Sequence, residues 1–74
     1  MQVFEGVCVR WSDDEGWGAL RSDAVESDVF AHFSDIDGDG FRTLYVGQRV
    51  RFAVEPFPSW QDGYVFRAHD VQQR

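Results

Sequence analysis

Acidic residues at alternate positions form the motif in this chain that most resembles a metal site. Residues 35–40, DIDGDG, match the opening of an EF-hand calcium loop, in which carboxylates converge on the ion and a glycine permits a sharp turn. Such a loop also needs a bidentate glutamate at its twelfth position, where this chain has Val46. A strand-forming segment, rather than a helix, precedes the loop. We therefore expect a solvated acidic loop without a metal site.

Side chains that could act as nucleophiles or general bases are few. His32 and His69 are the two histidines, Cys8 is the single cysteine, and the serines are scattered. No catalytic triad is indicated, and one cysteine can form neither an internal disulfide nor a cysteine-based zinc site. We expect Cys8 to be buried and reduced, and His69 to be exposed. The sequence thus predicts no catalytic residue, no cofactor and no small-molecule substrate.

Aromatic side chains, at 16% of the chain, are better candidates for a binding site. Five of them lie in or beside the first three predicted strands and the loop that follows: Trp11, Trp17, Phe30, Phe33 and Phe41. Other residues suffice for a core: Val7, Val9, Leu20, Val29, Ala31, Ile36, Val50, Phe52 and Val54. Some of the rings must therefore face solvent, where they could stack on bases or contact another protein. Composition leaves both alternatives open.

The elements that position these rings are predicted to be short strands. β-Branched and aromatic residues favour strands over 3–11, 17–21, 29–33, 48–55 and 63–71, and no segment of ten or more residues has helical periodicity. The stretch EPFPSWQDG at 55–63 contains both prolines, and we expect it to be a loop without strand structure. With no helix to cover a sheet, five strands indicate an all-β barrel that closes on itself.

Alternation within the third predicted strand assigns its side chains to two faces. Val29 and Ala31 should fill the core, whereas Phe30 and His32 should share the outward face. Phe33, where the strand ends, is assigned to neither face. The sequence therefore predicts an exposed aromatic side chain at Phe30.

Length and charge limit the remaining functions. Seventy-four residues suffice for a single domain, 1–74, and we expect a cytoplasmic protein because neither a signal peptide nor an apolar membrane span is evident. The net charge is −6, and all seven basic residues are arginine. Strong nonspecific phosphate binding depends on summed positive charge and is not favoured. Stacking on aromatic rings is indifferent to net charge, so single-stranded nucleic acid stays a candidate partner.

Three segments resemble the cold-shock domain family. GWGAL at 16–20 is similar to the family's KGFGFI, DVFAHFS at 28–34 is nearly identical to DVFVHFS, and GFRTLYVGQRVRF at 40–52 resembles GFK/RTLxEGQxVxF. The resemblance extends from Gly6 to Val71. It implies a five-stranded antiparallel oligonucleotide-binding barrel in a bacterial RNA chaperone that binds single-stranded RNA or DNA and aids transcription and translation in the cold.

The resemblance also implies a set of nucleic-acid-binding residues, with Arg10 and Trp11 beside the rings that stack on bases: Trp17, Phe30, His32, Phe33 and Phe41. Three positions depart from the family pattern, because Glu15 replaces a lysine, Arg10 a surface tryptophan and Ala19 a phenylalanine. Arg10 can still bind phosphate or stack, but Ala19 cannot, so we expect weaker binding than is typical of the family.

The expected partner is pyrimidine-rich single-stranded RNA or DNA, bound with low sequence specificity, and no membrane. We expect a monomer, with a strand-exchanged dimer as the alternative. A rival hypothesis is that the barrel has become a protein-interaction module that uses Phe57 and Trp60 in the 55–63 stretch.

Overall fold

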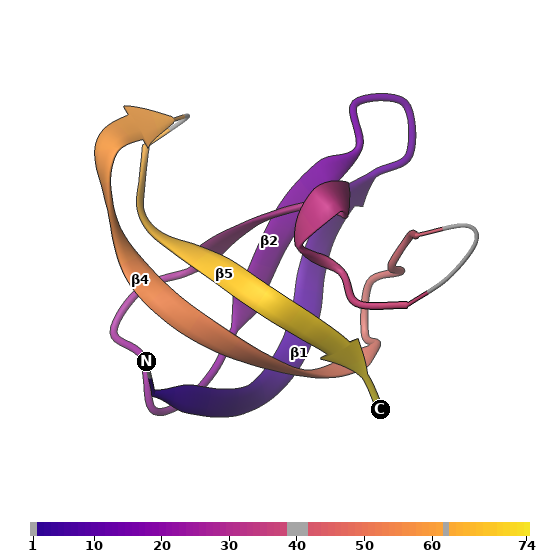
Figure 1. Cartoon of the computed structure of the whole chain (residues 1–74), viewed down its shortest axis with the longest axis horizontal. Coiled ribbons are helices and arrows are strands. Elements are labelled where there is room, and N and C mark those ends of the chain that lie inside the picture. Colours follow the sequence, from indigo (N-terminus) through magenta and orange to yellow (C-terminus); the bar gives the residue numbers. More distant parts are fainter. Residues whose placement is uncertain (1, 39–41, 62) are drawn as a thin grey trace.

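The chain folds into a closed barrel of five strands in a computed structural model that describes residues 2–38, 42–61 and 63–74, with the backbone alone over 57–61 (Figure 1). The elements follow one another as β1 (Val3–Ser12), β2 (Trp17–Arg21), β3 (Val29–His32), the 3-10 turn η1 (Phe33–Asp35), β4 (Arg49–Gln61) and β5 (Tyr64–Gln73). Around the barrel the order is β1-β2-β3-β5-β4, and β1 also pairs with β4. The predicted all-β, five-stranded barrel is confirmed.

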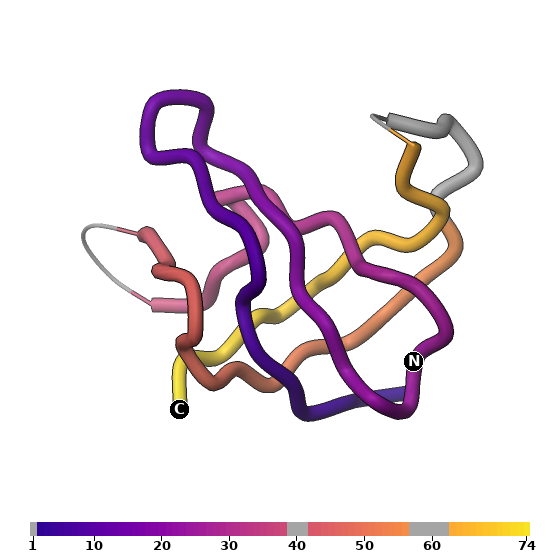
Figure 2. The backbone as a smooth tube through the Cα atoms, turned by 180° about the vertical axis from the view of Figure 1, so that it is seen from behind, coloured from indigo at the N-terminus to yellow at the C-terminus, as the bar shows by residue number. Residues whose placement is uncertain are grey.

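Most neighbouring strands run antiparallel, as predicted, and the barrel closes where β3 and β5 run parallel. The view from behind in Figure 2 shows β1 curving across the barrel to the β1–β2 turn at one end. This turn and the segment around residue 42 lie at the same end of the molecule in both views. No helix long and apolar enough to cross a membrane is found in the described part of the chain.

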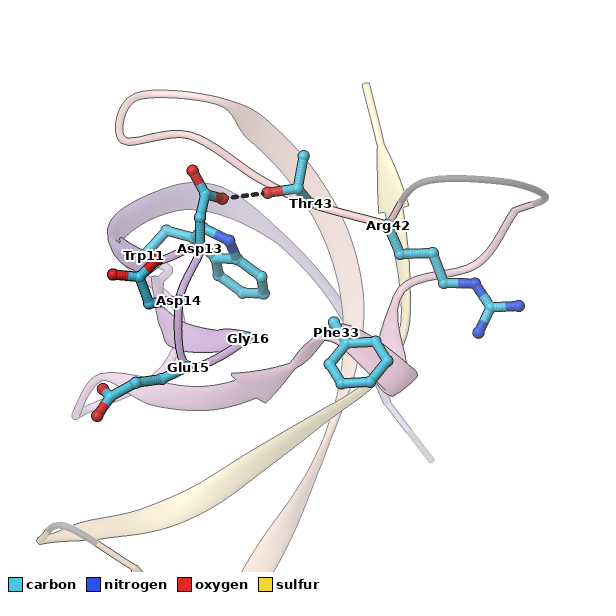
Figure 3. Close-up of a pocket in the computed structure, with 8 residues that line it drawn as sticks. All are labelled: Trp11, Asp13, Asp14, Glu15, Gly16, Phe33, Arg42 and Thr43. Atoms are coloured by element: carbon cyan, nitrogen blue, oxygen red, sulfur yellow. Dashed lines mark hydrogen bonds between the residues drawn. The ribbon is translucent and has the colours of Figure 1, made fainter.

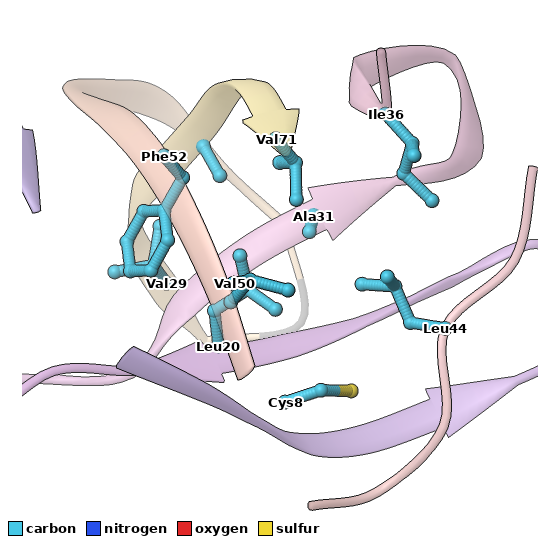
Figure 4. Packing of buried hydrophobic residues seen from close by; sticks show 10 residues of the cluster. Cys8, Leu20, Val29, Ala31, Ile36, Leu44, Val50, Phe52 and Val71 are labelled. Atoms are coloured by element: carbon cyan, nitrogen blue, oxygen red, sulfur yellow. The ribbon is translucent and has the colours of Figure 1, made fainter. Parts of the chain in front are cut away.

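Ten buried hydrophobic residues form the core between the strands (Figure 4). They are Cys8, Leu20, Val29, Ala31, Ile36, Leu44, Val50, Phe52, Ala68 and Val71. The inward placement of Val29 and Ala31 and the burial of Cys8 are confirmed. The predicted core positions on β1 are wrong, because Val7 is 36% exposed and Val9 is only half-buried. The pairing register shifts between Cys8 and Arg10, so Val9 is the extra residue of a β-bulge and Cys8 occupies the inward position.

Strand β4 is longer than the sequence predicts. The expected loop over 55–63 is wrong, since β4 continues to Gln61 and pairs Pro56 with Phe66 of β5. Pairing of β4 with β1 ends at Ala53, beyond which the Val54 amide reaches only the Gln2 carbonyl, at 3.4 Å. Amides two residues apart on a strand point to the same side, so the ring nitrogen of Pro56 faces the side that β1 has left. A residue without an N–H group is tolerated on such an edge.

Candidate functional site

Register across β1, β2 and β3 places the candidate binding residues in two adjacent rows on one outward face. Arg10 lies opposite Ala19, which lies opposite Phe30, and in the next row Trp17 lies opposite His32. Side chains opposite one another on paired strands are close enough to act together. The fold therefore brings Arg10, Trp17, Phe30 and His32 onto one face, as the sequence predicts.

Close approach of β1 and β2 beneath this face explains the glycine at position 18. A β-carbon on Gly18 would lie 2.0 Å from the carbonyl oxygen of Arg10, well inside van der Waals contact. Only glycine fits there without the two strands moving apart. The second glycine of the GWGAL segment is thus a packing requirement that keeps Arg10 and Trp17 side by side.

Phe30 is buried on this outward face, so the predicted exposure of its ring is wrong. Its side chain is 3% exposed although it lies outside the core cluster. The Trp17 ring stacks on it with centroids 5.3 Å apart, the Tyr64 ring lies 5.9 Å away, and the Arg67 guanidinium carbon is 5.9 Å from its centroid. Strand β5 brings Tyr64 and Arg67 to this position by pairing in parallel with β3 at Phe30. Phe30 therefore lies at the buried centre of an aromatic cluster that it forms with Trp17 and Tyr64.

Trp17 forms the more accessible part of the aromatic cluster. Its ring is half-buried, meets Tyr64 edge-on at 6.0 Å, and has the guanidinium carbon of Arg10 5.8 Å from its centroid. Such cation–π geometry leaves the Arg10 guanidinium beside the ring, where it can also meet a phosphate. Tyr64 was missed by sequence reasoning; its only signal was an aromatic residue at the start of the last predicted strand.

His32 and Phe33 lie where β3 passes into the turn η1. The strand ends at His32, one residue earlier than predicted, and His32 caps η1 because its Nδ1 accepts a hydrogen bond of 3.3 Å from the Ser34 amide. The rings of His32 and Phe33 lie 4.4 Å apart at a tilt of 41°. Phe33 is 45% exposed, so its ring offers a free face to solvent.

An open pocket of about 450 Å³ lies between the β1–β2 turn, Phe33 and the segment that leads to β4 (Figure 3). Its lining comprises Trp11, Asp13, Asp14, Glu15, Gly16, Phe33, Arg42 and Thr43. Two hydrogen bonds tie its walls together: the Thr43 hydroxyl donates to Asp13 Oδ1 at 2.7 Å, and the Phe33 amide donates to the Gly16 carbonyl at 2.8 Å. The pocket is thus braced before any ligand arrives.

Trp11 closes the inner side of this pocket. Its ring is half-buried against the core, and its indole N–H is buried without an acceptor among the residues that the structure describes.

Gly16 lies in the β1–β2 turn with a φ of 75°, and a β-carbon added to it would lie 2.8 Å from the Phe33 ring. Glycine there allows both the left-handed turn and the packing of Phe33 over it.

The acidic loop after β3 is not fully solvated, contrary to expectation. Asp35 is buried and accepts hydrogen bonds from the His32 amide at 3.1 Å and from both Nε and Nη2 of Arg67 at 3.3 Å. This pair holds Arg67 across the Phe30 ring. Residues 39–41 lie outside the described part of the chain, so the placement of Phe41 stays a prediction. Among the described residues, no group of three His, Cys, Asp or Glu side chains is arranged to hold a metal ion.

Cys8 is fully buried, and His69 is less exposed than the sequence predicts. His69 was expected to be exposed, but it is half-buried, with Nε2 bonded to Glu55 and Nδ1 3.7 Å from Asp35. The β4–β5 pairing places His69 opposite Ala53, two residues from Glu55. Burial raises the pKa of the Cys8 thiol above its ordinary value, and the thiol donates a hydrogen bond of 3.3 Å to the Arg10 carbonyl. Cys8 is therefore a core residue.

Comparisons with known proteins agree on one kind of domain. The model of the "Cold-shock" DNA-binding domain family matches residues 4–64. A cold shock-like protein of Aquifex aeolicus is 43% identical over 51 residues, which are 69% of this chain and 73% of that protein. A cold shock protein of Vibrio cholerae is 48% identical over 48 residues, 64% of this chain and 69% of that protein. Among solved structures, Drosophila Unr CSD456 has a TM-score of 0.71 over 99% of this chain and 27% of that chain, with 20% identity, a likeness of fold.

Proposed function

The chain belongs to the cold-shock domain family of nucleic-acid-binding proteins, and from this premise we propose that it binds single-stranded RNA or DNA by stacking unpaired bases on its aromatic face. The observation that carries the proposal is the combination of two accessible rings, Trp17 and Phe33, with the braced pocket between Phe33 and the β1–β2 turn. Rings on a rigid barrel stack on bases of any sequence, because every base has a flat π face. Binding is therefore sequence-tolerant and involves no catalysis.

Each predicted binding residue has a role under this proposal. Trp17 and Phe33 are the stacking surfaces, and His32 lies between them. Phe30 acts through Trp17, whose ring it supports from below at 5.3 Å. Arg10 meets backbone phosphates beside Trp17. The full set keeps Trp11 as a pocket wall and Phe41 by family resemblance, and adds Tyr64, which contacts both rings of the aromatic cluster.

Charge around the pocket argues for modest affinity. Asp13, Asp14 and Glu15 are exposed on the β1–β2 turn, where they repel phosphates. In the described part of the chain, Arg10 and Arg42 form no ion pair, and these two cations are available to the backbone. The logarithm of affinity should therefore fall only shallowly with the logarithm of salt concentration, with about two phosphates neutralised.

We further propose that residues 1–74 act as one monomeric domain in the cytoplasm, with pyrimidine-rich strands as partners. A protein that holds unpaired bases shifts weak hairpins toward their open form, because it binds only that form. This is the physical basis of an RNA chaperone that aids transcription or translation in the cold.

A second candidate function is contact with another protein. Tyr45 and Val46 are 66% and 64% exposed in the turn before β4, and Val46 occupies a position where the family pattern has a glutamate. Two exposed apolar side chains favour a protein contact at this turn. Phe57 and Trp60 were expected to serve such a contact, but their side chains are not among those that the structure describes.

A fluorescence titration tests the proposal. A pyrimidine-rich single-stranded hexamer should quench the tryptophan emission of the parent protein saturably, and a matched duplex should compete poorly because its base faces are covered. The control is Trp17→Phe, which keeps a stacking ring but loses the principal reporter. This variant should bind a dye-labelled hexamer nearly as well as the parent, and the change in its own emission, then due to Trp11 in the pocket wall, should be smaller. Absence of saturable binding to any single strand would leave the protein-contact hypothesis in its place.

A further inference from the structure

The pocket between Trp11 and Phe33 contains one carboxylate that is fixed in place. Asp13 Oδ1 accepts a hydrogen bond of 2.7 Å from the Thr43 hydroxyl, across 30 residues of sequence. In Figure 3, the Asp13 carboxylate is directed toward Thr43, whereas the Glu15 side chain extends away from Phe33. Asp13 therefore differs from its acidic neighbours on the turn, because its side chain is both oriented and part of the pocket wall.

We propose that Asp13 makes this site select bases that carry an exocyclic amino group, and in particular cytosine over uracil or thymine. The inference rests on the proposed function, because it concerns which base occupies the pocket once a single strand is bound. A carboxylate such as that of Asp13 can only accept hydrogen bonds. A base resting against Phe33 in this pocket presents its polar edge to a hydrogen-bond acceptor.

Cytosine and uracil differ in how they hydrogen-bond to the Asp13 carboxylate, although their rings have the same size. Cytosine carries an amino donor at position 4, the group that Asp and Glu side chains accept in sequence readout of DNA. Uracil carries a carbonyl oxygen there, and its single ring N–H is flanked by two carbonyl oxygens. These oxygens repel a carboxylate, so uracil leaves Asp13 either unpaired or in an unfavourable contact.

Thr43 acts as a positioning residue for this selection. Asp13 retains three of its lone pairs after accepting from Thr43, so the anchoring bond does not use up its capacity as an acceptor. Because the hydroxyl fixes the carboxylate in one orientation, little side-chain entropy is lost when a base arrives. Loss of the hydroxyl in Thr43→Val should weaken the preference without reversing it.

The test compares deoxycytidine and deoxyuridine hexamers, which differ in base but share sugar, charge and length. The parent should bind the cytidine hexamer about ten- to a hundredfold more tightly, the value of one hydrogen bond to a charged group. Asp13→Asn keeps an acceptor for Thr43 but adds an amide donor for the uracil carbonyl. In this variant the ratio of the affinities for the cytidine and uridine hexamers should fall to about one or below. The variant should also bind the uridine hexamer more tightly than the parent does, because one anion near the phosphates is gone.

Asp14→Asn is the matched control, since it makes the same charge change on the same turn. It should strengthen binding of both hexamers equally and leave their ratio as in the parent. The inference is overturned if the parent binds uridine as tightly as cytidine, or if Asp13→Asn and Asp14→Asn change the ratio alike. The proposed function fails separately, if the parent binds neither hexamer. Thermal melting of each variant confirms that the comparison is made on folded protein.

Discussion

Truncation of Phe30 should damage both the fold and the site, because its ring is buried beneath the residues proposed to bind. Burying a phenylalanine side chain contributes about 1.5–3 kcal/mol, and each aromatic contact, here with Trp17 and Tyr64, adds about 0.5–1.5 kcal/mol. Relaxation of the surrounding side chains over the gap offsets part of this loss. We expect Phe30→Ala to lower the free energy of unfolding by about 3 kcal/mol and the melting temperature by roughly 10–20 °C.

The matched comparison is Phe33→Ala, since Phe33 is 45% exposed. It should change the free energy of unfolding by less than about 1 kcal/mol while weakening single-strand binding by about 1–3 kcal/mol, the value of one base stack. Melting followed by circular dichroism and binding of a labelled hexamer at low temperature separate the two effects. The reasoning is refuted if Phe30→Ala melts within a few degrees of the parent, or if Phe33→Ala is the more destabilising change.

Three further substitutions or treatments probe other parts of the account. Glu15→Lys should raise single-strand affinity about fivefold at low salt and steepen the salt dependence measured by anisotropy, whereas an unchanged slope would place Glu15 away from the phosphates. Gly18→Ala should lower the free energy of unfolding by about 2 kcal/mol or more, since its β-carbon would lie 2.0 Å from the Arg10 carbonyl; a parent-like denaturant midpoint would contradict this close approach. Cys8, with its pKa raised by burial, should react slowly with a thiol reagent at neutral pH and rapidly in denaturant, and equal labelling rates would show that the thiol is exposed. The free energy of unfolding should also fall as pH rises above about 9, because the thiol then ionises in the unfolded chain before it ionises in the folded protein.

Local sequence pattern predicted the barrel and most of its inward side chains. Period-two alternation assigned Val29 and Ala31 to the core and Phe30 and His32 to the outward face, because in a strand the side-chain direction depends only on position. The same rule was wrong at Val7 and Val9, since a β-bulge changes the period by one residue and no sequence signal located it. Treating the prolines as strand breakers was likewise wrong, because one edge of β4 needs no N–H donor there.

Burial on the outward face could not be predicted from the sequence, because it depends on contacts between distant segments. Phe30 points away from the core, as alternation indicates, yet Tyr64 and Arg67 reach it from β5, more than thirty residues later. Arg67 is held there by Asp35, a residue that the sequence assigned to a solvated loop. The bond between Asp13 and Thr43, which braces the pocket, is of the same long-range kind.

The most direct test of the central claim is a map of backbone amide chemical shifts as a pyrimidine-rich single-stranded hexamer is added to isotope-labelled protein. The proposed interface predicts the largest changes at Arg10, Trp17, His32, Phe33 and Thr43, which span the aromatic face and the pocket. Amides on the outer side of β4, such as Arg51, should scarcely move. Changes concentrated at the exposed turn of Tyr45 and Val46, or no saturable change anywhere, would contradict single-strand binding by the aromatic face.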